Sequence, residues 1–244
     1  MSSPMRITSG FTQDAPFQPL AQIGQPNPMF YATFFDEFIG YLSGKYTETN
    51  TGNGSVGQTA GAFGRALFTT NSSTPAATDI SSMQIDAAAF TVASTYKFAY
   101  ACRFQVADAT NCAFNAGIIQ TTTTPFTVTD GIYFGKASGS TAITLYVVSG
   151  STVTGSVAMN YTPANATDFD LAFLYDGKGN VEAWAGAGLI GRVTNQNTAS
   201  IGYNSKVTPT SFPTAVLNPT VALQSGTAAS TTLNLDFLYA ARER

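Results

Sequence analysis

The stretch that decides the fold is Tyr96-Lys-Phe-Ala-Tyr-Ala-Cys-Arg-Phe-Gln-Val106. Its large apolar side chains fall on every second position: Tyr96, Phe98, Tyr100, Cys102, Phe104 and Val106. Successive side chains of a β-strand point to opposite faces of a sheet, so this period of two predicts one long strand. Lys97, Arg103 and Gln105 occupy the other face, and we therefore expect the strand to be half-buried.

Two hairpins are predicted farther along the chain. Ala142–Val148 and Thr152–Ala158 are rich in branched residues and flank a short connection that contains glycine. Phe169–Tyr175 alternates apolar and polar residues, and Asp176-Gly-Lys-Gly-Asn180 then turns the chain into Val181–Ala185. Antiparallel pairing is expected in both.

Further strands are expected at Phe34–Leu42, Arg65–Thr69, Ile80–Asp86 and Leu233–Tyr239. No stretch of eleven or more residues has a helical period with caps at both ends, so the predicted fold class is an all-β antiparallel sandwich. The glycine-rich segment Gly52–Gly64 is interpreted as a loop, because a phosphate-binding loop needs a strand before it and a helix after it.

Composition favours a single domain whose surface packs closely against other protein subunits. The 244 residues are 44% hydrophobic, which is enough for a single sandwich core. Only 10% are charged, against about 25% in typical soluble proteins. The net charge is -3 and no run of Lys or Arg occurs, so we expect no nucleic-acid partner.

The N-terminus and the hydropathy pattern point to a soluble protein. Residues 1–10 lack a signal-peptide core, and no window approaches the roughly 18 apolar residues that cross a bilayer. We expect synthesis in a cytoplasm and no membrane contact. Cys102 and Cys112 are the only cysteines and there is no histidine, which excludes the usual zinc sites and disulfide frameworks, so both thiols are predicted to be free.

Residues 1–33 form a separate, proline-rich N-terminal arm, and residues 34–244 form the sandwich. Five prolines oppose helix and central strand in the arm. A disordered tail is normally charged and poor in aromatic residues, whereas this segment is the reverse. We therefore expect it to dock on a protein surface, either across a neighbouring subunit, which we predict, or over its own sheet. The expected contact residues are Phe11, Phe17, Leu20, Ile23 and Phe30.

The segment from Asp168 to Trp184 and the closing strand Leu233–Tyr239 together resemble concanavalin A-like jelly-roll domains. The resemblance covers about residues 34–241. It implies that Phe35–Leu42 and Leu233–Tyr239 are antiparallel neighbours. Lectins, glycanases and virion proteins share this fold, so it does not decide function. With low charge, an N-terminal arm and no targeting signal, the chain looks most like a head decoration or cement protein of a tailed bacteriophage.

Catalytic residues are not expected. The absence of histidine excludes the standard Ser and Cys triads. Glycanases of this fold carry a Glu-x-Asp-x-x-Glu strand motif with paired carboxylates, and the motif does not occur here. Asp168 and Asp170 with Glu182 on the next strand come nearest to it. We interpret these three as members of a solvated strand face.

Two other features could bind a ligand, but the sequence favours a structural role for each. Asp176–Asn180 offers too few oxygens for calcium, so a tight turn is predicted and no metal or cofactor is expected. Trp184, the only tryptophan, could stack on a sugar ring, but it adjoins alternating apolar positions that favour packing on the sheet.

Three function classes remain. The first is a non-enzymatic structural virion protein that binds the major capsid protein or other virion subunits and forms a homo-oligomer, with a trimer as one arrangement. The alternative is a carbohydrate-binding, lectin-like module of a phage fibre or tail, with Trp184 as its glycan contact. A hydrolase is the third, and it lacks the expected acid and nucleophile. The expected location is the virion, assembled in the host cytoplasm.

Overall fold

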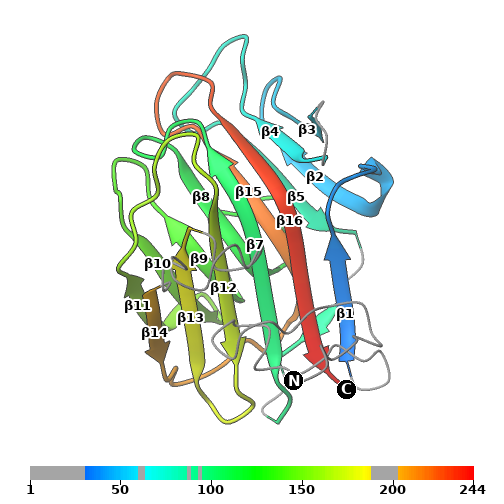
Figure 1. Ribbon diagram of the computed structural model, residues 1–244, viewed down its shortest axis with the longest axis vertical. Helices are drawn as coiled ribbons and strands as arrows, with labels where there is room; N and C mark the ends of the chain where they lie inside the picture. Colours follow the sequence, from blue (N-terminus) through cyan, green and yellow to red (C-terminus); the bar gives the residue numbers. More distant parts are fainter. Residues whose placement is uncertain (1–30, 60–63, 87–88, 93–94, 188–202) are drawn as a thin grey trace, which may run out of the picture.

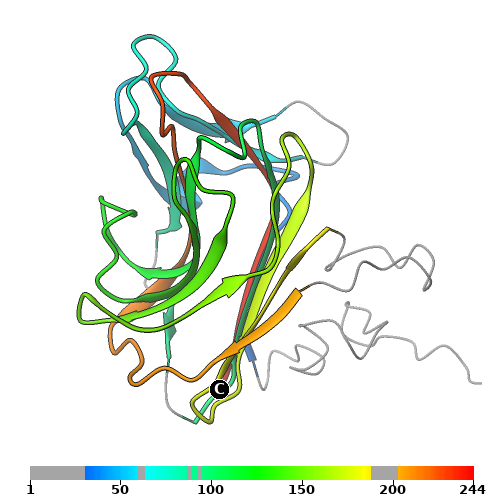
Figure 2. The same cartoon turned by 90° about the vertical axis from the view of Figure 1, so that its left-hand side faces the viewer.

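The computed structural model describes residues 31–59, 64–86, 89–92, 95–187 and 203–244. Within these ranges the chain forms sixteen β-strands and one three-residue 3-10 helix, η2 (Ser43–Lys45). The strands make two antiparallel sheets stacked face to face, with the hydrophobic core between them (Figures 1 and 2). The all-β sandwich predicted from sequence is confirmed.

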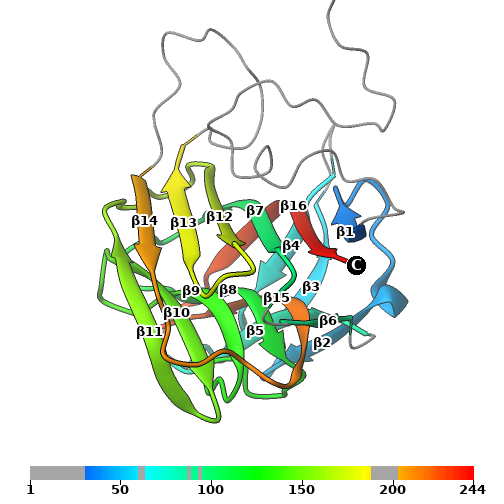
Figure 3. The ribbon, with the colours of Figure 1, turned by 90° about the horizontal axis from the view of Figure 1, so that it is seen from below.

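The first sheet, sheet A, holds eight strands, and β1 pairs with β16 beside the main path. Across the sheet they are β14 (Tyr203–Val207), β13 (Val181–Gly186), β12 (Phe169–Tyr175), β7 (Phe98–Val106), β16 (Thr232–Glu243), β4 (Ala66–Thr69) and β3 (Ser55–Gln58), with β1 (Tyr31–Asp36). Figure 3 shows this layer edge-on above the second one.

The second sheet, sheet B, also holds eight strands, and β6 pairs with β15 beside its main path. Across the sheet they are β11 (Thr152–Met159), β10 (Ile143–Ser149), β9 (Gly131–Lys136), β8 (Ala113–Gln120), β15 (Val216–Gln224), β5 (Ile80–Ile85) and β2 (Tyr46–Asn50), with β6 (Phe90–Thr91).

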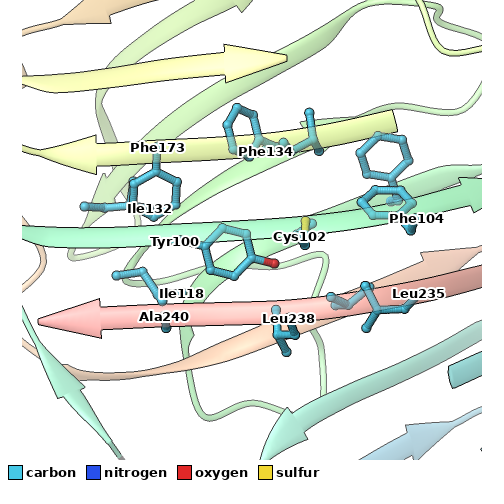
Figure 4. Close-up of a cluster of buried hydrophobic side chains, with 14 of the residues drawn as sticks. Tyr100, Cys102, Phe104, Ile118, Ile132, Phe134, Phe173, Leu235, Leu238 and Ala240 are labelled. Atoms are coloured by element: carbon cyan, nitrogen blue, oxygen red, sulfur yellow. The ribbon is translucent and has the colours of Figure 1, made fainter. Parts of the chain in front are cut away.

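The alternation predicted for Tyr96–Val106 is confirmed in β7 from Phe98 onward, whereas Tyr96 lies before the strand and is 37% exposed. Tyr100, Cys102 and Phe104 point into the core, where they meet side chains from both sheets (Figure 4). The expectation of a half-buried strand is wrong, because Ala99 and Ala101 on the opposite face are buried as well. Only the end of that face, at Arg103 and Gln105, is partly exposed.

The first and last strands pair antiparallel in sheet A, as the resemblance implied, with Phe35 opposite Tyr239. The strand bounds differ from the expected Phe34–Leu42, because β1 begins at Tyr31 and ends at Asp36. The chain leaves the sheet at Phe38, whose φ of +55° is incompatible with a strand. Pairing to β16 therefore covers only the first three residues of the predicted segment, Phe34–Asp36.

Both predicted hairpins form. β10 pairs with β11 through a turn in which Gly150 has a φ of +56°, a conformation that glycine adopts without strain. β12 pairs with β13, with Tyr175 opposite Val181. The interpretation of Gly52–Gly64 as a loop is wrong in its middle, because Ser55–Gln58 forms the edge strand β3 against β4.

Both cysteines are free and buried in the core, which confirms that prediction. Burial in an apolar environment disfavours the thiolate, so it raises the pKa of the Cys102 thiol to about 12 and that of Cys112 to about 11. Neither thiol is activated for chemistry at neutral pH.

Candidate functional site

The most exposed large apolar side chains of the described residues lie in one short loop. Ile39 and Leu42 are each 69% exposed, and both belong to Glu37–Leu42, between β1 and η2. Phe38, next to Ile39, is completely buried in the core. The segment Glu37–Leu42, here called the presented loop, therefore has one deep anchor and two apolar side chains that face water.

Specific contacts fix this loop to the sandwich. The amide of Phe38 donates to Oδ1 of Asp36 at 2.8 Å. Nε2 of Gln58 donates to the carbonyl oxygens of Phe38 at 3.0 Å and Ile39 at 2.9 Å. Because the carbonyls of the positive-φ residue Phe38 and of the following Ile39 both accept from Gln58 on β3, the loop is held in one conformation.

A polar cluster beneath the loop strengthens the anchor. The carboxylate of Asp36 accepts from Nζ of Lys45 at 2.6 Å and also from the hydroxyl of Tyr46. The Tyr46 ring stacks on Tyr41 with centroids 5.7 Å apart, and the Tyr41 hydroxyl donates to Oε1 of Glu48 at 2.5 Å. Burial acts to raise the pKa of Asp36, but the hydrogen bonds from Lys45, Tyr46 and Phe38 outweigh it and lower that pKa.

A second cluster lies on the outer face of sheet A, where three carboxylates meet two guanidinium groups. Asp170 is completely buried and takes two bonds from Arg103, Nε to Oδ1 at 2.7 Å and Nη2 to Oδ2 at 3.0 Å. Asp168 takes two bonds of 2.9 Å from Arg65. Asp236 lies 3.7 Å from Arg65 and 4.0 Å from Arg103.

This cluster corrects the interpretation of Asp168, Asp170 and Glu182 as one solvated strand face. Asp170 is opposite Gly186, whereas Glu182 is opposite Leu174. Four residues along a strand separate the two carboxylates, or about 13 Å. Asp170 is bonded to Arg103 instead of water, and Glu182 is paired in register with Lys206 on β14. The three residues do not form a catalytic pair.

Apolar side chains form a row across the middle of the outer face of sheet A. The register places Phe35, Tyr239, Ala101, Ala172 and Trp184 in one row across five strands. The two alanines form the floor of the row, and Tyr239 and Trp184 stand on either side of them. Trp184, the expected alternative glycan contact, is only 4% exposed in this row.

An accessible aromatic pair lies on the outer face of sheet B. The rings of Tyr133 and Tyr146 are 5.5 Å apart, and both side chains are half-buried. They lie over Gly135, where an added Cβ would be 3.1 Å from the Tyr146 ring. Burial, and to a smaller extent Tyr146, raises the pKa of Tyr133 to about 12. This pair was not predicted, although the alternation in Gly131-Ile-Tyr-Phe-Gly135 places Tyr133 between two glycines on one face.

The Asp176–Asn180 segment closes on itself as a turn. Oδ1 of Asp176 accepts from the amides of Lys178 at 2.7 Å and Asn180 at 3.0 Å, and Oδ2 accepts from Nδ2 of Asn180 at 2.7 Å. These bonds use the oxygens that calcium would need. Among the described residues, no group of three or more His, Cys, Asp or Glu side chains could hold a metal ion.

The expected arm contacts Phe11, Phe17, Leu20, Ile23 and Phe30 lie outside the described residues. The described part of the chain contains no helix long and apolar enough to cross a membrane.

Comparison with known proteins finds similarity in structure only. No protein-family model matches the chain, and no curated protein matches its sequence. A protein of unknown function from Shewanella oneidensis MR-1, SO2946, is similar with a TM-score of 0.60 at 13% identity, over 97% of this chain and 96% of that one. The endo-1,3-beta-glucanase of Streptomyces sioyaensis is similar with a TM-score of 0.57 at 10% identity, over 88% and 98%.

The CBM2 module of the evolved Dit of Lactobacillus casei BL23 phage J-1 is similar with a TM-score of 0.54 at 12% identity, over 87% of this chain and 96% of that one. Plant lectins are also among the similar structures. Identities this low show the fold alone. The chain is a concanavalin A-like jelly roll, the β-sandwich of lectins, carbohydrate-binding modules and glucanases.

Proposed function

We propose that this chain is a non-enzymatic structural protein of a virion, a capsid decoration or cement protein of a tailed bacteriophage that packs against the major capsid protein and other subunits. The observation that carries the proposal is the presented loop. It holds Ile39 and Leu42 in water on a backbone that Asp36, Phe38 and Gln58 fix in place.

A loop of this kind suits protein contact. Burying an exposed Ile or Leu side chain contributes on the order of 1.5 to 3 kcal/mol. The ordering cost of binding is small when the backbone is already fixed. Only 10% of the residues are charged. Fewer charged groups therefore have to lose their hydration when the surface packs against another protein.

The carboxylates of sheet A support a role without catalysis. A glycosidase needs one carboxyl group that holds a proton and another that is free to attack or to activate water. Asp168 and Asp170 instead each take two bonds from an arginine. Arginine stays charged at any ordinary pH, so it remains a donor to both oxygens of its partner carboxylate.

Substitution in the presented loop tests the proposal. Ile39→Ser with Leu42→Ser removes both apolar groups and leaves the Phe38 anchor intact. Val153→Ser is the matched control, because Val153 is also exposed but lies on the edge strand β11. We expect the double variant to keep its melting temperature and lose at least tenfold in homo-oligomer affinity or in binding to purified heads. Loss in the control alone, or in neither variant, contradicts the proposal.

A second function, glycan binding by a module of a phage fibre or tail, is favoured by the Tyr133–Tyr146 pair and by the similarity to a phage carbohydrate-binding module. Aromatic faces open to solvent can stack on sugar rings. A glycan array separates the two functions. Binding that disappears in Tyr133→Ala and persists in Trp184→Phe supports the second, and an array without signal counts against it.

A further inference from the structure

Arg242 occupies the last core-facing position of β16, at the end of the sandwich that Figure 3 views. The register sets Arg242 opposite Phe98 of β7, just as Ala240 is opposite Tyr100. Phe98, Tyr100 and Ala240 all belong to the core between the two sheets. Residues paired across strands point to the same face of a sheet, so the stem of Arg242 runs along the rim of the core.

The guanidinium group of Arg242 has no acceptor within the described part of the chain. Its Nε is buried without a hydrogen-bond partner, and no described carboxylate forms an ion pair with the group. The neighbouring Glu243 points to the opposite face of the strand, where its Oε2 accepts from the amide of Lys97 at 3.1 Å. Because a buried donor without a partner costs free energy, an acceptor at this position would stabilise the protein.

Arg65 and Arg103 show how the same protein uses a guanidinium group that has a carboxylate beside it. Arg65 makes two bonds of 2.9 Å to Asp168, and Arg103 makes bonds of 2.7 and 3.0 Å to Asp170. The planar fork of N–H donors matches the two oxygens of a carboxylate. Arg242 carries the same fork without such a partner among the described residues.

The ring of Tyr96 holds the guanidinium group in place. Cζ of Arg242 lies 5.3 Å from the centre of this ring, which is a cation–π contact. Tyr96 is 37% exposed and Arg242 is partly exposed, so the pair lies at the surface. The arginine is also rooted between two paired strands, because β16 pairs there with both β7 and β1. The donors are therefore preorganised for a ligand that arrives from solution.

We propose that Arg242 and Tyr96 form a binding site for a single carboxylate, which a protein partner presents as an Asp or Glu side chain. The two Nη nitrogens donate to the two carboxylate oxygens, and the Tyr96 ring keeps the guanidinium plane fixed. A water molecule could accept one of these bonds, but only an anion also neutralises the charge.

The site is separate from the presented loop. Ala32 lies opposite Arg242 on β1, four residues before Asp36, which is a distance of about 13 Å along the strand. The inference therefore goes beyond the proposed assembly role and does not rest on it, since the carboxylate site stands whatever the presented loop binds.

A carboxylate fits this position better than a phosphate group does. Glu243 adjoins the site, and its charge repels a dianionic phosphate more strongly than a singly charged carboxylate. The whole chain has a net charge of -3 and no run of Lys or Arg that would follow a phosphate backbone.

An apolar neighbour at the same end of the sandwich favours a protein as the source of the carboxylate. Val216 on β15 is 42% exposed, and β15 pairs there with β6. The ring of Phe90 on β6 packs against Phe98, the residue opposite Arg242, with centroids 5.4 Å apart. A partner segment with an acidic residue beside an apolar one can therefore contact both Arg242 and Val216.

Titration followed by proton–nitrogen NMR near neutral pH tests the site. The probe is sodium acetate, and sodium chloride at the same concentration controls for ionic strength. We expect the signals of Arg242 to shift and saturate with acetate, while the Nε–H signals of Arg65 and Arg103 stay in place because their donors are already bound.

Three variants assign the binding to the proposed groups. Arg242→Lys keeps the charge but loses the fork, so we expect acetate affinity to fall at least tenfold. Tyr96→Leu removes the ring and should lower the affinity at least threefold. Arg244→Lys is the matched control, because Arg244 is exposed and follows two residues later, and it should leave the affinity unchanged. Circular dichroism checks each fold, and Tyr96→Leu decides if Arg242→Lys does not fold.

Two further probes identify the ligand. A blocked tetrapeptide Gly-Glu-Leu-Gly, whose only charge is the Glu side chain, should bind at least tenfold more tightly than acetate, and inorganic phosphate should bind more weakly. No saturable shift, the same shift with chloride, or unchanged affinity in Arg242→Lys overturns the site. Phosphate that binds more tightly than acetate, or a peptide that binds no more tightly, overturns the assignment to a protein carboxylate.

Discussion

The guanidinium group of Arg103 makes two parallel bonds to the carboxylate of Asp170, at 2.7 and 3.0 Å, and Asp170 has no exposed surface. A charge buried this completely is tolerated only while its partner stays in place. The pair joins β7 to β12 on the side of sheet A that faces away from the core.

Removing one partner is predicted to cost much more than removing both. Arg103→Met leaves the Asp170 carboxylate buried without its two donors, and we expect a loss of about 3 to 5 kcal/mol in the free energy of unfolding. Arg103→Met with Asp170→Leu is expected to cost clearly less. Urea denaturation of the three proteins measures this. A double variant as unstable as Arg103→Met would show that the pair is not coupled.

Acid is predicted to release the presented loop through Asp36. The pKa of this carboxyl is lower in the folded state than its ordinary value of 3.8, so its stabilising effect is full above about pH 4 and is lost as pH falls through the folded pKa. Asp36→Asn should cost about 1.5 to 3 kcal/mol at pH 7, as expected for hydrogen bonds to a charged group.

The same comparison at lower pH provides the check. The difference in unfolding free energy between wild type and Asp36→Asn should shrink steadily from pH 4 to pH 2. A difference that stays constant over this range would mean that the Asp36 charge does not hold the loop.

Gly64 is predicted to be indispensable for the same loop. Its φ is +56°, and an added Cβ would lie 2.3 Å from the carbonyl oxygen of Phe38. Gly139 is the matched control, since its φ is +72° but nothing lies within 4 Å of an added Cβ. Gly139→Ala should lower the free energy of unfolding only by the cost of placing alanine in the left-handed backbone region, about 1 to 2 kcal/mol.

Gly64→Ala must in addition push the backbone of Phe38 away, so we expect a loss of more than about 3 kcal/mol. Thermal unfolding of both variants measures the difference. Equal losses at the two positions would show that the approach to Phe38 is not tight.

Much of this fold follows from the sequence, and the exceptions have physical causes. Alternation identified β7, β12 and β16 because each has one face of large apolar residues toward the core. β8 mixes small and large residues on its core face, Phe114, Ala116 and Ile118, so its alternation is weak, and β15 carries Pro219 in its middle, where the residue lacks a ladder donor. The sequence offered no comparable signal for these two strands.

The candidate surfaces were harder to predict than the fold. The presented loop falls in what looked like the second half of a strand, because Ile39 and Leu42 are apolar and only the positive φ of Phe38 turns them outward. Asp170 looked like a solvated residue because its partner Arg103 is distant in sequence. Contacts between strands that are far apart in the chain decided both outcomes.

The thiols are predicted to be inert in the folded protein. A pKa of about 12 for Cys102 and about 11 for Cys112 leaves almost no thiolate at pH 8, and both side chains are buried. Ellman's reagent should label neither cysteine at pH 8 and both after unfolding in guanidinium chloride. Rapid labelling of the native protein would contradict the core packing at Cys102 or Cys112.

Electron cryo-microscopy of virions isolated from the source cells tests the central claim most directly, because it locates this chain and resolves what surrounds its presented loop. The account predicts ordered copies of the jelly roll on the capsid, with Ile39 and Leu42 buried against another protein subunit. Virions that lack this chain, or copies whose presented loop faces solvent while Tyr133 and Tyr146 contact a glycan, would contradict it.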